Sequence, residues 1–227
     1  MKSFKKFLGS YFSSHTLEKR KSRVNPYLEV VYSKGKLRMN SRTINYSDDG
    51  RHAIFEKAFS KFNVEKRNIK NVLVLGFGSG SVVSLLQNDY KMNCKITGVE
   101  ADEVVIDLSK KHFQLGEIKN LTLHCADAYD FVFECKGKFD LIVMDAFIDK
   151  YVPKKFHEEV FVKSLCSLLS ENGILFFNYI SIDERTENGL QKILSILKQL
   201  HGTAVRYAVS ILGIGNVVMI YERNENA

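Results

Sequence analysis

Glycines recur at every second position after an apolar run near the middle of the chain. The run VLVL at residues 72–75 leads directly into GFGSG, and the residues that follow have the composition of a helix. A strand, a glycine turn and a helix in this order present backbone N–H groups to the sugar or phosphate of a ligand. This pattern identifies five candidate contacts for a nucleoside-containing cofactor: Gly76, Phe77, Gly78, Ser79 and Gly80.

Three carboxylates follow the next three runs that are typical of strands. Glu100 ends KITGVE about twenty residues after the glycines, Asp127 follows LTLHCA, and Asp145 follows FDLIVM. A carboxylate in the position of Glu100 can accept hydrogen bonds from both ribose hydroxyls. Because the carboxyl ends of parallel strands meet at one edge of a sheet, we expect these acids and the glycines to surround one ligand. Each acid alone could instead cap the helix or turn that follows it.

The elements that must position these residues alternate between strands and helices from residue 71 onward. Five apolar runs are separated by amphipathic runs, which predicts an α/β fold whose parallel sheet is covered on both faces. Two further strand-like runs flank Gly213 and Gly215. Such a short separation permits only a hairpin, so the final strand is expected to run antiparallel to its neighbour.

Residues 1–68 are predicted to form a small N-terminal module, and residues 69–227 the ligand-binding domain. The run LEVVYSKGKLRMN alternates around a turn at Gly35, as a hairpin does, and TINYS at residues 43–47 could extend that sheet. Helical spacing predicts a basic amphipathic helix from Phe4, Phe7, Leu8, Tyr11 and Phe12. It predicts a second helix whose apolar side carries Ile54, Phe55, Ala58, Phe59 and Phe62.

Charge is divided unevenly along the chain, whose net charge is +7. Lys and Arg outnumber Asp and Glu by 17 to 6 in residues 1–70, whereas they are outnumbered by 20 to 16 in residues 71–227. The basic front could dock nucleic acid or an anionic membrane, and the acidic body could attract a cationic substrate. We favour docking of the first helix onto protein.

Composition argues against several other classes of protein. No apolar run reaches the roughly 18 residues that span a bilayer, and the N-terminus lacks a signal-peptide pattern, so we expect a cytoplasmic protein. The six histidines show no HxxxH or HExxH spacing, and we predict no metal site. The four cysteines show no CxxC spacing, and we interpret them as buried thiols: Cys94, Cys125, Cys135 and Cys166.

The spacing of the glycines separates two classes of nucleoside cofactor. The dinucleotide fingerprint is G-x-G-x-x-G, but here its third glycine position holds Ser81, and the pattern is G-x-G-x-G. Together with the C-terminal hairpin, this resembles the S-adenosylmethionine-dependent methyltransferase fold, a seven-stranded Rossmann-like sheet. The resemblance implies S-adenosylmethionine, or its decarboxylated form, as the cofactor.

A closer resemblance covers residues 72–180, about half the chain. The runs VEADEVVIDLSKKHF, LTLHCADAYDFV, FDLIVMDAFIDKYVP and VFVKSLCSLLSENGILFFN are similar to successive blocks of the spermidine synthase family and its methyltransferase-like relatives. A small β-rich N-terminal module is also that family's layout. The resemblance implies that Glu100 holds the ribose, that Asp127 and Ala128 meet the adenine edge, and that Asp145 lies at the reacting centre. It places the neighbouring Ala101 and Ala146 against the cofactor as well.

Departures from the family pattern bear on the reaction. Spermidine synthases have an aspartate where Ser79 stands, and that carboxylate grips the amine of decarboxylated S-adenosylmethionine. The family's second acid after this strand is present one residue late, as Asp149, which could close over a substrate. The helix that carries a tyrosine and a glutamate toward the polyamine in that family offers only Glu56. Asp149 and Glu56 are therefore candidate substrate contacts, and Tyr151 and His157 are candidate contacts at the rim.

These residues are compatible with three functions. We favour an S-adenosylmethionine-dependent transferase that moves a methyl group to a small-molecule acceptor such as an amine, with Asp145 as the catalytic residue. The alternative is a polyamine aminopropyltransferase, which Asp145 and Asp149 favour and Ser79 opposes. A non-catalytic scaffold whose basic front binds nucleic acid or a protein is the third and is not favoured. We expect a homodimer.

Overall fold

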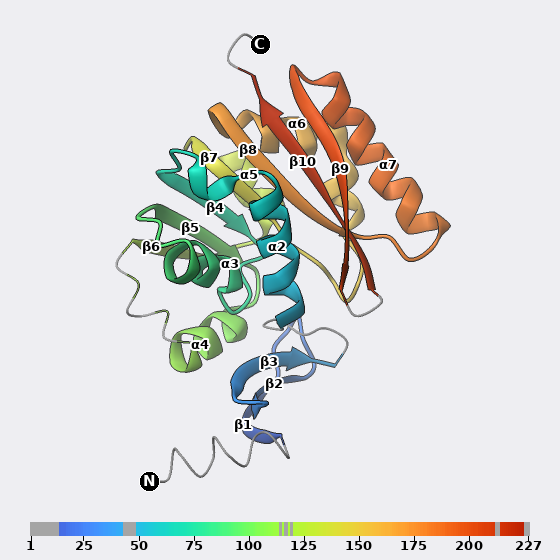
Figure 1. Ribbon diagram of the computed structural model, residues 1–227. Coiled ribbons are helices and arrows are strands. Elements are labelled where there is room, and N and C mark those ends of the chain that lie inside the picture. The colour runs from blue at the N-terminus through green and yellow to red at the C-terminus, as the bar shows by residue number, and fades with distance from the viewer. Residues whose placement is uncertain are drawn as a thin grey trace.

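The computed structural model describes residues 14–42, 49–113, 115, 118, 120–211 and 214–224. A small sheet near the N-terminus and a large sheet of seven strands form its frame (Figure 1). The small sheet contains β1 (His15–Arg20), β2 (Leu28–Ser33) and β3 (Lys36–Ser41). The large sheet contains β4 (Asn71–Leu75), β5 (Lys95–Glu100), β6 (Leu121–Cys125), β7 (Phe139–Met144), β8 (Leu169–Ile180), β9 (Gly202–Ile211) and β10 (Ile214–Arg223).

Along the sequence, most of the helices alternate with the strands of the large sheet, as predicted. The α-helices are α2 (Asp49–Lys61), α3 (Ser81–Ser84), α4 (Glu103–His112), α5 (Ala128–Glu134), α6 (Glu159–Ser167) and α7 (Glu184–Gln199). Shorter turns are the 3-10 helices η1 (Val64–Lys66) and η4 (Lys154–His157) and the π turn η2 (Leu85–Asp89). None of the helices in the described part of the chain is long and apolar enough to span a membrane.

The strand order places the turning point of the chain beside β4. The order is β6-β5-β4-β7-β8-β10-β9, and the strands from β6 to β8 run parallel. The chain runs outward from β4 to β6 and then returns to β7, on the other side of β4. Strand β10 pairs antiparallel with both β8 and β9. The predicted Rossmann-like seven-stranded sheet with an antiparallel C-terminal hairpin is confirmed.

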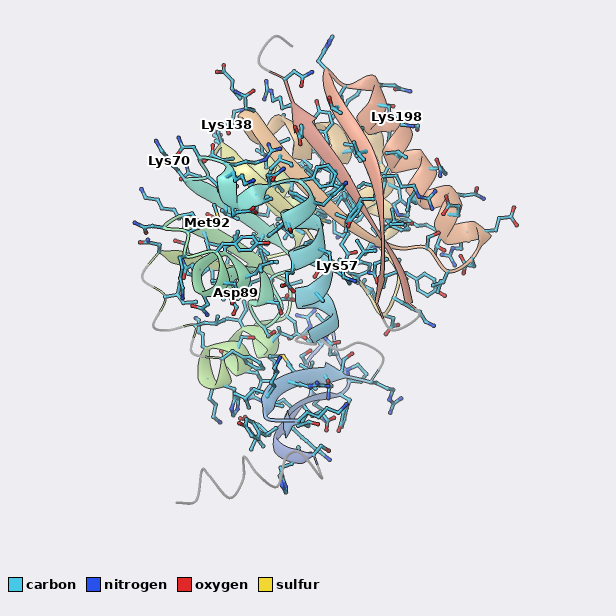
Figure 2. The ribbon with its side chains drawn as sticks, in the orientation of Figure 1. Lys57, Lys70, Asp89, Met92, Lys138 and Lys198 are labelled. Atoms are coloured by element: carbon cyan, nitrogen blue, oxygen red, sulfur yellow. The ribbon has the colours of Figure 1, made fainter. Side chains whose placement is uncertain are left out.

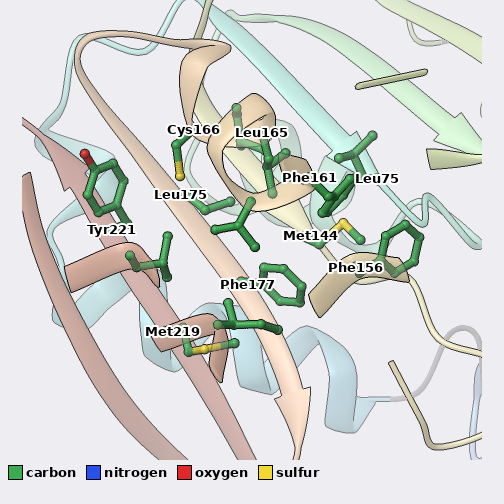
Figure 3. Close-up of a cluster of buried hydrophobic side chains, with 14 of the residues drawn as sticks. Leu75, Met144, Phe156, Phe161, Leu165, Cys166, Leu175, Phe177, Met219 and Tyr221 are labelled. Atoms are coloured by element: carbon green, nitrogen blue, oxygen red, sulfur yellow. The ribbon is translucent and has the colours of Figure 1, made fainter. Parts of the chain in front are cut away.

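Successive residues of the central strands enter two hydrophobic clusters, one on each face of the sheet. Leu73 and Leu75 of β4 belong to a cluster with α5, α6 and α7, whereas Val72 and Val74 belong to one with α2 and α3. This alternation follows from the pleat, and burial of both faces explains why the strand is apolar throughout. Figure 3 shows part of the first cluster, around Leu75 and Phe161.

The small sheet packs against α4, below the large sheet in Figure 1. Its β2–β3 hairpin turns at Lys34 and Gly35, whose φ angles of 50° and 75° are left-handed, and the predicted hairpin is confirmed. Strand β1 was not predicted, because its side chains are mostly exposed and leave no apolar alternation. The stretch 43–47 lies outside the described residues. The shared core contains Leu28, Val30, Met39, Val104, Val105 and Leu108.

Helix α2 packs on the large sheet although it precedes residue 68. The predicted apolar side is confirmed, since Ile54, Phe55, Ala58 and Phe59 are buried. The rings of Phe59 and Phe176 meet edge to face, with centroids 4.8 Å apart. The division into residues 1–68 and 69–227 stays a prediction.

Two further predictions concern the N-terminal helix and the burial of the cysteines. The basic helix predicted within residues 1–13 lies outside the described residues. Cys94 and Cys166 are buried as predicted, but the prediction is wrong for the half-buried Cys135 and the exposed Cys125. Cys125 ends β6, an edge strand with an otherwise largely exposed surface, so its apolar neighbours in sequence do not bury it.

Candidate functional site

A cavity of about 230 Å³ lies at the carboxyl edge of the large sheet, where the chain turns back beside β4. Residues that follow β4, β5, β6 and β7 line it, which is the arrangement expected of a ligand site in a sheet of this kind. The predicted site residues that line it are Gly76, Gly78, Glu100, Ala101, Asp127, Ala128, Asp145 and Ala146.

The other predicted residues lie elsewhere. Phe77 and Ser79 are buried within the glycine turn and do not line the cavity, and the Phe77 ring covers Gly98 of β5, where a Cβ would clash with it. Gly80 begins α3 in a left-handed conformation, with φ at 86°. Asp149 and Glu56 are exposed and are not among the residues that line the cavity. Tyr151 and His157, the candidate rim contacts, line a different cavity together with Tyr179 and Lys154.

The glycine turn is wedged between two strands. Gly76 has a φ of 81°, and a Cβ on it would lie 2.5 Å from the carbonyl oxygen of Asp145. The backbone N–H groups of Gly76 and Phe77 both donate to the carbonyl of Val99, at 2.9 and 3.0 Å. Only glycine combines this left-handed backbone with such a close approach. The end of β7 and the turn after β4 are therefore held at a fixed separation.

Glu100 ties the glycine turn to the end of β5. Its side chain is 8% exposed, with Oε2 accepting from the Gly78 N–H at 2.9 Å and Oε1 from the Asp102 N–H at 3.1 Å. Burial raises the pKa of Glu100 above its usual value, and the two backbone donors oppose that rise. Ser109 of α4 also holds the turn, because its hydroxyl donates to the Gly78 carbonyl at 3.0 Å. Asp102, rather than Glu100, caps α4.

Asp127 both caps a helix and lines the cavity. Its Oδ1 accepts from the backbone N–H of Tyr129 at 2.8 Å, so the capping role considered for it from the sequence is present. Its Oδ2 forms an ion pair with Lys155 at 2.5 Å, and both side chains are a little over one third exposed. Lys155 comes from η4, so this pair joins two different elements that line the cavity.

Asp145 ends a chain of buried hydrogen bonds. It is 9% exposed, and its Oδ1 accepts from the Asn178 amide at 2.8 Å. The Asn178 carbonyl oxygen accepts in turn from the Asn216 amide at 3.1 Å, and these two side chains are 2% and 5% exposed. The network fixes which atoms of Asn178 face Asp145, because the amide can donate in only one of the two directions. The carboxylate is thereby oriented by β8 and β10.

Sequence reasoning missed Asn178 and Asn216, although a signal was present. Each is a single amide within an otherwise apolar strand, in LFFNYI and GNVVMI, and buried polar side chains are seldom placed without a partner. It also missed Val24, which lines the cavity from the loop between β1 and β2. Ser22 and Asn25 of that loop donate to Asp102 Oδ2 at 2.5 and 2.7 Å, so the small sheet is tied to the site.

Within the described ranges, no group of three His, Cys, Asp or Glu side chains could hold a metal ion. The polar side chains that reach the cavity are carboxylates and one lysine, each engaged by a backbone or side-chain partner. Such an arrangement is suited to binding hydroxyl and amine groups of an organic ligand.

Residues 58–222 match the spermine/spermidine synthase domain, which is most of the chain. The chain belongs to this family. The spermidine synthase-like chain is 32% identical over 115 residues to a polyamine aminopropyltransferase of Vibrio vulnificus, a match that covers 49% of this chain and 38% of that protein. It is 28% identical over 144 residues to an eEF1A lysine and N-terminal methyltransferase homolog of Drosophila melanogaster, covering 56% and 21%. The chain thus matches well under half the length of these relatives.

Solved structures show the same fold. A spermidine synthase in complex with the transition state analogue AdoDATO has a TM-score of 0.73 at 15% identity, covering 93% of this chain and 74% of that one. Human methyltransferase-like protein 13 in complex with SAH has a TM-score of 0.61 at 20% identity, covering 76% and 83%. The spermidine synthase-like fold is therefore shared by proteins named for two different transfers.

Proposed function

We propose that this chain is an S-adenosylmethionine-dependent transferase that moves a methyl group to an amine or another small-molecule acceptor. One observation carries the proposal: the glycine turn and three carboxylates from neighbouring strand ends line a single cavity, with Asp145 held by a buried amide. Membership of the spermine/spermidine synthase domain family supports it, because the relatives include both polyamine aminopropyltransferases and methyltransferases.

The residues of the cavity fit an adenosine-containing cofactor. Glu100 brings a buried carboxylate to the end of β5, where ribose hydroxyls can donate to it. Asp127 and Ala128 lie at the end of β6, one strand further from β7, and we assign them to the adenine edge. Asp145 lies on the other side of the glycine turn, and we assign it to the reacting centre.

Asp145 is the group that would receive or hold the acceptor's proton. The bound sulfonium supplies the driving force for transfer of its methyl carbon. The acceptor's lone pair forms the new bond to that carbon while the carbon–sulfur bond breaks and its electron pair stays on sulfur. The proton lost by the acceptor passes to Asp145, which Asn178 keeps in one orientation. Alignment and proton removal are then the tasks of this chain.

Aminopropyl transfer is the second candidate. Family membership and the acids Asp145 and Asp149 favour it, and Ser79 opposes it because a hydroxyl supplies no negative charge for the amine of decarboxylated S-adenosylmethionine. Ser79 is 5% exposed and does not line the cavity. The position at which spermidine synthases have an aspartate therefore brings no carboxylate to the cofactor here.

Calorimetry with the two cofactors separates these candidates. Purified protein is titrated with S-adenosylmethionine and with decarboxylated S-adenosylmethionine in separate runs, and the two dissociation constants are compared. Tighter binding of S-adenosylmethionine is the expected result. Tighter binding of the decarboxylated form would contradict methyl transfer and favour aminopropyl transfer. No heat with either ligand would favour the scaffold and contradict both enzymes.

We also propose that the protein is a homodimer, which light scattering coupled to gel filtration measures directly. A mass of about 52 kDa, twice the 26.0 kDa of the chain, is the expected result. A cytoplasmic location stays a prediction. Nucleic-acid binding by the basic front is not favoured, and a gel-shift assay at physiological salt tests it.

A further inference from the structure

A second cavity, of about 240 Å³, lies between the segment that follows β7, the end of β8 and the first turns of α7. Three cationic side chains line it, Lys154 of η4 and Arg185 and Lys192 of α7. No Asp or Glu is among its lining residues. We call it the basic cavity, and the first one the carboxylate cavity.

The cations of the basic cavity are not in direct contact with a carboxylate in the described residues. Lys154, Arg185 and Lys192 form no ion pair within the described part of the chain. Arg185 and Lys192 help to lower the pKa values of Asp183 and Glu159, but both of these acids have other partners. Asp183 accepts from Thr186 as the cap of α7, and Glu159 pairs with Lys163. Three cations that converge without a carboxylate create a positive potential that attracts anions.

Two polar groups form the inner wall of the basic cavity. Tyr179 is 2% exposed, and its hydroxyl lies 3.2 Å from His157 Nε2. Burial lowers the pKa of His157, with Lys192 adding to the effect, so this ring is neutral at neutral pH. Gly189 of α7 packs directly against this hydroxyl, because a Cβ there would clash with the Tyr179 oxygen, and both residues line the cavity.

Arg185 is held in place at the mouth of the cavity by an aromatic ring. Its guanidinium carbon lies 5.7 Å from the centroid of the Tyr151 ring. A cation–π contact of this kind does not use the guanidinium N–H donors, which remain available to a ligand. A planar set of N–H donors matches the paired oxygens of a phosphate group.

We infer that the basic cavity binds a phosphate group, as free phosphate or as the phosphate of a small phosphomonoester. Three cations and a buried hydroxyl fit a dianion with several acceptor oxygens, whereas an amine or a sulfonium would be repelled. The inference does not depend on the proposed transfer reaction. The residues that line the basic cavity are different from those that line the carboxylate cavity.

Titration with inorganic phosphate, in the absence of any cofactor, tests this inference. Heats are measured by calorimetry against sodium chloride at matched ionic strength, and a parallel arm uses glycerol phosphate as the phosphomonoester. The variant carrying Arg185→Gln and Lys192→Gln should bind phosphate roughly tenfold or more weakly, because charged donors contribute most to such recognition. Tighter binding of glycerol phosphate would assign the site to a phosphomonoester, and equal or weaker binding to free phosphate.

Lys198→Gln is the control for loss of a surface cation, since it removes one positive charge from the same helix, as Lys192→Gln alone does. Lys198 is exposed in the last turn of α7 (Figure 2). It follows Lys192 by six residues, about 9 Å along the helix axis. Its phosphate affinity should stay within about twofold of the parent, as expected for a remote surface charge. Equal weakening in this control, or unchanged affinity in the double variant, would overturn the inference. So would an absence of phosphate binding to the parent.

Folding of the variants is checked separately. Arg185 and Lys192 are exposed, so the melting temperature of the double variant should lie within a few degrees of the parent. If the double variant does not fold, Lys192→Gln alone is titrated, and it should still weaken phosphate binding more than Lys198→Gln does.

Discussion

The carboxylate cavity and the basic cavity have almost the same volume, about 230 and 240 Å³, but opposite charge. Glu100, Asp127 and Asp145 reach the first, with Lys155 as the one cation among its lining residues, whereas the second is lined by cations without a carboxylate. Cavity size therefore does not distinguish the two regions. Their ligands are distinguished by which side chains the fold directs into each.

Residues that are adjacent in sequence, in β8 and in η4, contribute to different cavities. Asn178 and Tyr179 are adjacent in β8, yet Asn178 binds Asp145 and Tyr179 lines the basic cavity. Successive residues of a strand point to opposite faces of the sheet, which accounts for this division. The turn η4 divides in a similar way, since Lys155 lines the carboxylate cavity and Lys154 the basic one.

The largest effect is expected for the carboxylate assigned to the reaction. Asp145→Asn keeps the shape of the side chain and can still accept from Asn178, but it loses the charge and most of the basicity. The transfer rate should fall about 10²–10⁴-fold, the range that general-base catalysis supplies. Cofactor affinity should be nearly unchanged, and the melting temperature should stay within a few degrees of the parent.

Asp107→Asn on the exposed side of α4 is the control for this loss of charge, and its rate should match the parent. A large fall in the melting temperature of Asp145→Asn would instead make Asp145 a structural residue. A stable and fully active variant would mean that the acceptor arrives already deprotonated and that alignment alone is catalytic.

Removal of the ribose carboxylate should affect binding rather than rate. Glu100→Ala should weaken binding of S-adenosylmethionine by about 1–3 kcal/mol, the usual cost of leaving polar partners unpaired. Part of this cost comes from the glycine turn, because the Gly78 N–H loses its acceptor. Calorimetry measures the affinity, and circular dichroism confirms that the variant is folded. Unchanged affinity in a folded variant would move the ribose away from Glu100.

A smaller change in rate is expected for the positioning residue Asn178. Asn178→Ala removes the donor that orients Asp145 and leaves Asn216 without its acceptor. The rate should fall about tenfold and the free energy of unfolding by about 1–3 kcal/mol, because buried groups lose their partners.

Asn178→Gln keeps the amide and should recover part of the rate lost in Asn178→Ala. A loss of stability with an unchanged transfer rate would limit Asn178 to a structural role. That outcome would leave Asp145 without the orientation that we assign to it.

The smallest effect separates two adjacent lysines. Lys155→Ala frees Asp127 from a partly exposed ion pair, an interaction usually worth at most about 1 kcal/mol. S-Adenosylmethionine should then bind about twofold to fivefold more tightly, the factor that such an energy permits. Lys154→Ala should leave this affinity unchanged, since its side chain lines the other cavity. Equal effects of the two substitutions would contradict the division of η4 between the cavities.

The fold could be predicted closely from local patterns. The apolar run 72–75, the glycines after it and the spacing to Glu100 depend only on neighbouring residues, because pleat, helix period and turn geometry are local properties. The same applies to the carboxylates after β6 and β7 and to the C-terminal hairpin. These patterns were sufficient to place eight predicted residues around one cavity.

The remaining features of the two cavities were decided by tertiary structure. The bond between Asp145 and Asn178 joins residues 33 positions apart, and the bond between Asn178 and Asn216 joins residues 38 apart. Lys155 meets Asp127 only because η4 folds back over the end of β6. Each residue's sequence neighbours determine which face of its element it occupies. Which groups it meets on that face depends on the order of the strands, and that order is set by packing across the whole sheet.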